Sequence, residues 1–109
     1  MDHLPYSVVT DTGDTFDIQF PLSPHTQDSV RVHQLLTTIM NGLANDLKIL
    51  GDVSNGDILQ AVTMAVAIRA RMIHAPDSTM REIVSNLTET ALEASYAAEI
   101  GRASCRERV

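Results

Sequence analysis

The sequence predicts a mainly helical α+β domain, in which an N-terminal β-hairpin packs on a three-helix antiparallel bundle. Two short runs of β-branched and aromatic residues flank a turn near the N-terminus, and three longer segments with helical apolar spacing follow them. The connections between the helical segments are short, which makes sequential helices antiparallel neighbours. A chain of 109 residues has room for one domain, which we place at residues 1–99.

The hairpin is predicted at about residues 6–20. Tyr6 to Thr10 and Thr15 to Phe20 are the two strands, and the cluster between them contains Gly13, which accepts the positive φ of a tight turn. In the second strand the apolar residues alternate with polar ones, as in a strand with one buried face. The residues expected on the buried face are Phe16, Ile18 and Phe20.

The first helix is predicted at about residues 25–50. Ser23 or Thr26 could cap its start, and Gly51 marks its end. Gly42, inside the helix, suggests a close contact with another helix. The apolar residues recur at steps of three and four and fall on one face: Val32, Leu35, Leu36, Ile39, Leu43, Leu47 and Leu50.

The second and third helices are predicted at about residues 56–75 and 79–98. Ser54 and Asp57 form an S-x-x-D capping box at the start of the second, which is apolar over most of its circumference. Such a helix must be covered on several sides, so we expect it to be the buried centre of the bundle. Thr79 and Glu82 form a possible capping box for the third helix.

The last ten residues, 100–109 (IGRASCRERV), form a basic run that differs from the acidic helical pattern before it. One reverse translation of the run resembles the start of a common sequencing adaptor, so we interpret it as a non-native tail and leave it out of the predicted fold. The tail holds three arginines, one glutamate and Cys105, the only cysteine. Without its net charge of +2, residues 1–99 carry −8 rather than the −6 of the whole chain.

Charge and composition exclude several classes of function. A charge of −8 repels phosphate backbones, so we expect no nucleic-acid partner and no binding to anionic membranes. No apolar run is long enough to span a bilayer and no signal peptide is visible, which predicts a cytoplasmic protein. The four histidines lack metal-ligand spacing, and no nucleophile motif or phosphate-binding loop occurs. We therefore predict no metal, no cofactor and no catalytic residues.

Arg69 is the most informative single residue, because helical spacing places it on the apolar face of the second helix with Ile58 and Val62. A buried arginine requires an acidic partner, for which the candidates are Asp17, Asp28 and Glu82. Otherwise its long side chain extends past the end of the bundle into water. The alternative interpretation is an anion-binding cluster near the start of the third helix, formed by Arg69, Arg71 and Arg81.

Leu92 and Tyr96 lie one turn apart, off the apolar face of the third helix, and are the candidate interaction surface. The leading prediction is therefore a small acidic protein-interaction or regulatory module, which forms a homodimer or binds another protein. A small-anion sensor or enzyme subunit that uses the arginine cluster is the alternative. A helix-turn-helix DNA binder is the third interpretation, and the acidic charge disfavours it.

Overall fold

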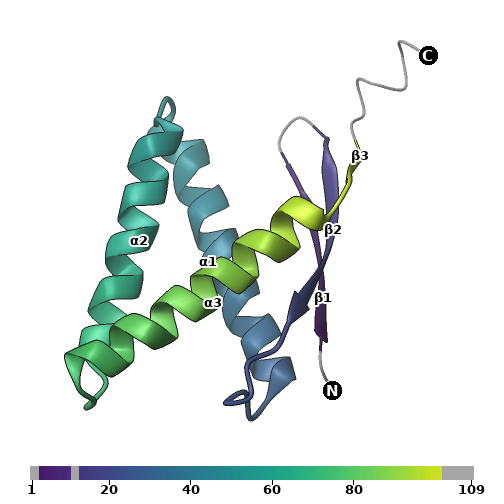
Figure 1. Ribbon diagram of the computed structural model, residues 1–109. Coiled ribbons are helices and arrows are strands. Elements are labelled where there is room, and N and C mark those ends of the chain that lie inside the picture. The colour runs from purple at the N-terminus through teal and green to yellow at the C-terminus, as the bar shows by residue number, and fades with distance from the viewer. Residues whose placement is uncertain (1–2, 11–12, 102–109) are drawn as a thin grey trace. The chain divides into compact units, whose positions relative to one another are not determined.

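The computed structural model describes residues 3–10 and 13–101 (Figure 1). The α+β class is confirmed: an antiparallel hairpin precedes three helices, and a two-residue strand follows them. The elements are β1 (His3–Val9), β2 (Thr15–Pro21), α1 (Ser29–Leu50), α2 (Asn55–Arg71), α3 (Asp77–Ala97) and β3 (Ile100–Gly101).

The chain divides into two compact units. The first unit, residues 1–33 and 86–109, contains the sheet, the beginning of α1 and the second half of α3. The second unit, residues 34–85, contains the rest of α1, the whole of α2 and the beginning of α3.

The two long strands pair over their full length, which makes the hairpin three residues longer at its start and one longer at its end than predicted. Tyr6 lies opposite Ile18, and Leu4 lies opposite Phe20. Leu4 and Ile18 are only 7% and 6% exposed, and they are the only buried apolar residues in the described part of the chain. Their neighbours on the same face, Tyr6, Val8, Phe16 and Phe20, are half-buried. The predicted alternation of the second strand is confirmed.

The turn of the hairpin is stabilised by its flanking residues. The backbone N–H of Thr10 donates to the carbonyl of Asp14 at 2.9 Å, and the N–H of Asp14 donates to the Thr10 hydroxyl at 3.1 Å. Gly13 has a φ of 87°, a left-handed conformation that side chains with a Cβ rarely adopt. On the outer face of the sheet, the hydroxyl of Ser7 donates to the carboxylate of Asp17 at 2.7 Å.

A third strand corrects the expectation that the last ten residues take no part in the fold. Ile100 pairs with Phe16, and Gly101 pairs with Thr15, so β3 lies antiparallel to β2. The sheet order is therefore β1-β2-β3. The physical reason is that an edge strand offers unpaired N–H and carbonyl groups to any extended segment within reach. The rest of this tail, residues 102–109, lies outside the described residues.

Helix α1 begins at Ser29 rather than near residue 25, because Asp28 is its cap. The carboxylate of Asp28 accepts the backbone N–H of Arg31 at 3.1 Å, which satisfies one of the free amides of the first turn. The predicted caps Ser23 and Thr26 instead form a turn before the helix, in which the N–H of Thr26 donates to the carbonyl of Ser23 at 3.0 Å. The helix ends at Leu50, before Gly51 with a φ of 80°, as predicted.

The predicted cap of α2 is confirmed, since the hydroxyl of Ser54 accepts the N–H of Asp57 at 3.0 Å. The helix ends at Arg71, earlier than predicted. Residues 72–76, which end with Pro76, form the connection to the next helix. Helix α3 then begins at Asp77, where the carbonyl of Pro76 accepts the first helical bond from Met80 at 3.1 Å. Thr79 is therefore inside the helix rather than its cap.

The expectation that the second helix is the buried centre of a bundle is wrong for the single chain. No residue of α2 is buried, and the same holds for α1 and α3. Exposed large apolar side chains on α2 include Leu59, Met64 and Ile68. An apolar helix whose large side chains are exposed has that surface available to other molecules. Within the described residues, no helix is both long and apolar enough to cross a membrane.

Candidate functional site

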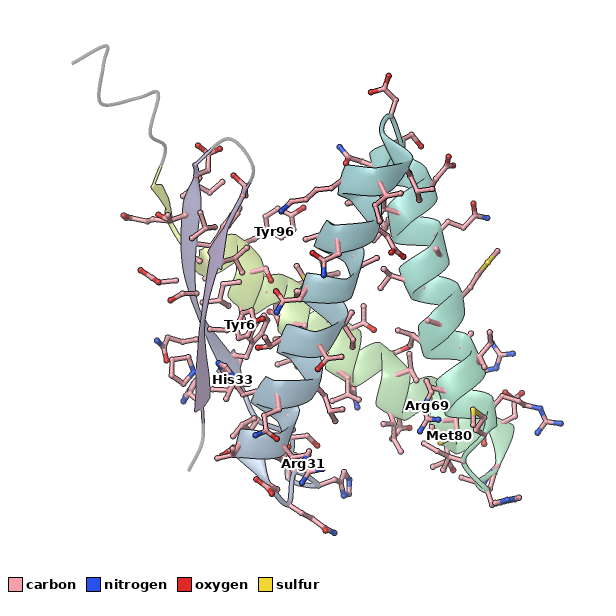
Figure 2. The ribbon with its side chains drawn as sticks, turned by 180° about the vertical axis from the view of Figure 1, so that it is seen from behind. Tyr6, Arg31, His33, Arg69, Met80 and Tyr96 are labelled. Atoms are coloured by element: carbon pink, nitrogen blue, oxygen red, sulfur yellow. The ribbon has the colours of Figure 1, made fainter. Side chains whose placement is uncertain are left out.

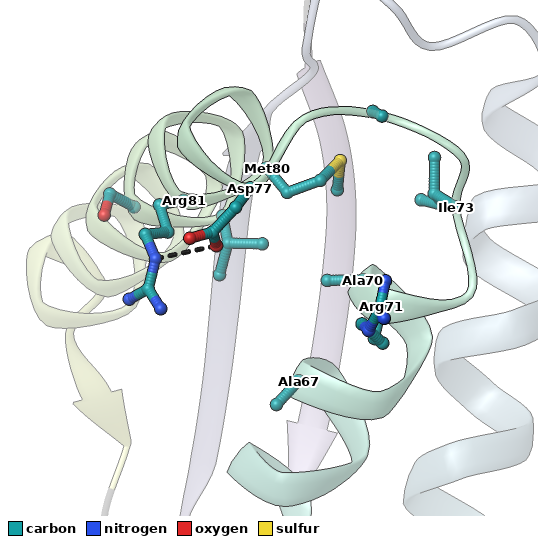
Figure 3. Close-up of a pocket in the computed structure, with 10 residues that line it drawn as sticks. Ala67, Ala70, Arg71, Ile73, Asp77, Met80 and Arg81 are labelled. Atoms are coloured by element: carbon teal, nitrogen blue, oxygen red, sulfur yellow. Dashed lines mark hydrogen bonds and ion pairs between the residues drawn. The ribbon is translucent and has the colours of Figure 1, made fainter.

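A pocket of about 680 Å³ lies within the second unit, where the end of α2 meets the start of α3 (Figure 3). Ile73 and Ala75 of the connection between the two helices line it. Most of its lining atoms are apolar, and they belong to small or aliphatic side chains. The lining residues are Ala67, Ala70, Arg71, Ile73, Ala75, Asp77, Met80, Arg81, Val84 and Ser85.

Two of the three arginines in the predicted anion-binding cluster line this pocket. Arg71 comes from the last turn of α2, and Arg81 comes from the second turn of α3. Arg69 is not among the lining residues. The structure therefore brings together part of the cluster, because the short connection between α2 and α3 sets the end of one helix beside the start of the next.

Arg81 is already paired. Its Nε donates to the Asp77 carboxylate at 2.8 Å, one helical turn away (Figure 3). Both side chains are exposed, and such a pair contributes about 0.3–0.5 kcal/mol. The bond uses only Nε, which leaves the two terminal nitrogens of the guanidinium as free donors. Within the described part of the chain, the structure gives Arg71 no ion-pair partner.

The ion-paired interpretation of Arg69 is wrong, whereas the extension of its side chain into water agrees with the structure. Arg69 is exposed, and its Nη1 contacts the sulfur of Met72 at 3.4 Å rather than a carboxylate. Glu82, the predicted acidic partner in the same unit, forms no ion pair with it among the described residues. The physical reason is that no residue of α2 is buried, so the long side chain reaches water without an internal partner.

The pocket can hold a ligand that is both apolar and anionic. Alanine, isoleucine and valine side chains offer contact to an aliphatic group, while guanidinium groups recognise carboxylates and phosphates through paired N–H donors. Asp77, on the same rim, reduces the positive charge that such a ligand meets. The arrangement supports binding, and it contains no nucleophile with an adjacent base.

The predicted interaction surface lies in the first unit, on the second half of α3 (Figure 2). Tyr96 is 86% exposed, and Leu92, one turn earlier, is also exposed. Their helix carries Glu89 and Glu93 nearby, so this surface combines apolar and acidic groups. The structure places both residues where a partner could reach them.

Sequence reasoning missed the larger exposed surface on α2. Met64 and Ile68 on this helix, and Met72 directly after it, are all exposed, although the apolar pattern assigns them to a core. The sequence does contain an indication of this exposed surface. The helix is apolar on nearly every side, and a short chain has few other elements that could cover it. Among the described residues, no group of three histidine, cysteine or acidic side chains is placed to hold a metal ion.

Comparisons with protein-family models, with curated proteins and with solved structures find no match to this chain. The function is therefore argued from the exposed surfaces and the pocket.

Proposed function

We propose that this chain is a small acidic protein-interaction module without catalytic activity of its own, whose helices bury apolar side chains against a protein partner. One observation carries the proposal. All three helices have the apolar residues of packed helices, yet none of their residues is buried within the chain. Monomeric proteins rarely expose apolar patches of more than a few hundred Å², and larger patches mark contact surfaces.

The second unit makes the argument strongest, because the structure describes all of residues 34–85. Completing the burial of one half-exposed aliphatic side chain contributes about 1 kcal/mol, and several such residues on one face are needed to offset the entropy lost on association. The large apolar side chains exposed there are Leu35, Ile39, Met40, Ile49, Leu50, Leu59, Met64, Val66, Ile68, Met72 and Ile73.

The first assembly to test is a homodimer, because closed two-fold pairing is the commonest arrangement of soluble oligomers. Sedimentation equilibrium of the full chain over a wide concentration range measures its mass directly. Urea unfolding adds a second readout, since the midpoint of a folded dimer rises with protein concentration. We expect both the mass and the midpoint to increase with concentration.

A chain that stays monomeric, unfolds cooperatively and binds no apolar dye would contradict the proposal. Dyes such as ANS fluoresce on exposed apolar surface, so their absence would mean that the helices cover one another within a single chain. A monomer that binds the dye would instead point to a different protein as the partner.

The second candidate function is a sensor or enzyme subunit that binds a small anion through Arg71 and Arg81. The observation that favours it is that both arginines line one pocket, together with small and aliphatic residues such as Ala67, Ala70 and Val84. A ligand that binds only the folded state raises the melting temperature, so phosphate and octanoate can be compared with chloride at equal ionic strength. Stabilisation that disappears in the Arg71→Gln, Arg81→Gln double variant would support this function, and its absence would remove it.

A further inference from the structure

Helix α2 carries one exposed face that is apolar in the middle and oppositely charged at its two ends. Residues at steps of three and four share this face, which we name the α2 face. Ile68, at 61% exposed, is typical of it. Asp57 lies at one end of the face in the first turn, and Arg71 lies at its edge in the last turn. The residues between them are Ala61, Met64, Ala65 and Ile68.

Asp57 and Arg71 are separated by 14 residues, or about 21 Å along the helix. Met64 is the midpoint between them. When two copies of α2 lie antiparallel with the two-fold axis beside Met64, Asp57 of each copy is level with Arg71 of the other. A parallel arrangement sets Asp57 against Asp57 and Arg71 against Arg71. The charges of this helix therefore match a second copy in the antiparallel direction only.

We propose that a second copy of this chain docks on the α2 face, with the two α2 helices antiparallel about a two-fold axis at Met64. The inference rests on the proposed function and names its partner. Ala61 and Ala65 let the two backbones approach closely, and the unbranched Met64 adapts its shape to its symmetry mate. Each contact across the axis occurs twice, as a self-complementary interface requires.

The charges of the other two helices favour α2 as the pairing element. Helix α1 has no acidic residue in its first turn, and α3 has no basic residue in its last turn. The surface of Leu92 and Tyr96 also carries Glu89 and Glu93, so two copies of it would bring like charges together. Only α2 combines an acidic first turn with a basic last turn. Electrostatic complementarity of this kind sets the direction in which two surfaces pair.

Charge reversal on the full chain tests the pairing. Arg71→Asp and Asp57→Arg each replace two attractive contacts by two repulsive ones, so we expect the dimer dissociation constant to rise at least tenfold for either. The double variant restores opposite charges and should return the constant to within about threefold of the original. Recovery in the double variant also shows that neither change prevents the helix from forming. In a parallel dimer, the single variants would meet like charges before and after the change and would have little effect.

An apolar pair of variants tests the face itself. Ile68→Gln should weaken the dimer, whereas Leu59→Gln is the matched control, because Leu59 is 68% exposed and lies on the opposite side of α2. If the dimer dissociation constant is unchanged by Ile68→Gln and by the charge reversals, the α2 pairing is wrong. The proposed function as an interaction module would not be contradicted by that result. A chain that stays monomeric at every concentration would overturn the pairing, and if it also binds no apolar dye, the proposed function fails with it.

Discussion

The ring of Tyr6 lies against the ring of His33, with 5.1 Å between their centroids and an angle of 59° between their planes (Figure 2). The contact joins the middle of β1 to the beginning of α1, and both residues belong to the first unit. Tilted aromatic pairs at this separation contribute beyond the area that they bury. The ring contact is therefore one link between the sheet and the helical part of that unit.

Replacing His33 by alanine is expected to lower the free energy of unfolding by about 1 kcal/mol, because the ring contact is lost. His33→Phe keeps a ring and should retain most of the stability. His25→Ala is the control, since His25 is exposed in the turn before α1 and has no ring contact in the described residues. Urea unfolding measures all three variants, and equal losses for His33→Ala and His25→Ala would show that the ring contact contributes nothing.

The small buried centre of the sheet predicts a contrast between adjacent residues. Ile18 is buried, while Gln19 points to the opposite, exposed face of β2. Ile18→Ala should lower the free energy of unfolding by about 2 kcal/mol or more, since it leaves a cavity beside Leu4 and Tyr6. Gln19→Ala should stay within about 0.5 kcal/mol of the original chain. Comparable losses in thermal or urea unfolding would mean that the sheet has no buried face.

The local features of this fold were predictable from the sequence. The alternation of Phe16, Ile18 and Phe20, the cap at Ser54 and the stop at Gly51 each depend on residues within one or two turns of each other. The start of α1 was harder, because Ser23, Thr26 and Asp28 can all act as caps. Only the structure shows that the Asp28 carboxylate accepts the amide of Arg31.

The environment of α2 could not be predicted in the same way. Its apolar circumference indicates that something covers it, but a sequence pattern does not distinguish cover by the same chain from cover by another. The prediction that Arg69 is buried depends on the same cover, so the exposure of α2 makes both predictions wrong. In the candidate site, the sequence predicts that Arg71 and Arg81 lie near the same connection, because they are close along the chain. The sequence does not predict the direction of the Arg69 side chain, which contacts Met72.

Because Arg69 is exposed, we expect its removal to have only a small effect on the free energy of unfolding. Arg69→Ala should change the free energy of unfolding by no more than about 0.5 kcal/mol, as for an ordinary surface residue. A buried ion pair would instead lose about 3 kcal/mol or more when one partner is removed. Urea unfolding at low protein concentration separates the two cases. A large loss that appears only at high concentration would place Arg69 at a contact between copies, because such a contact forms by mass action.

Gly42, inside α1, and Gly51, directly after its last residue, provide an opposed pair of substitutions. Gly42 lies inside α1, and a Cβ built there meets nothing within 4 Å, so the close helix contact expected from the sequence is absent in the single chain. Gly42→Ala should therefore raise the free energy of unfolding by about 0.5–1 kcal/mol through better helix propensity. Gly51 also has open space around it, but its φ of 80° strains any side chain, so Gly51→Ala should lower stability by about 1 kcal/mol. Both variants are compared by urea unfolding at micromolar and at high concentration.

If Gly42→Ala stabilises the dilute chain yet weakens its assembly, Gly42 lies at a contact between chains. If Gly42→Ala destabilises the dilute monomer, α1 is closely packed at Gly42 within its own chain.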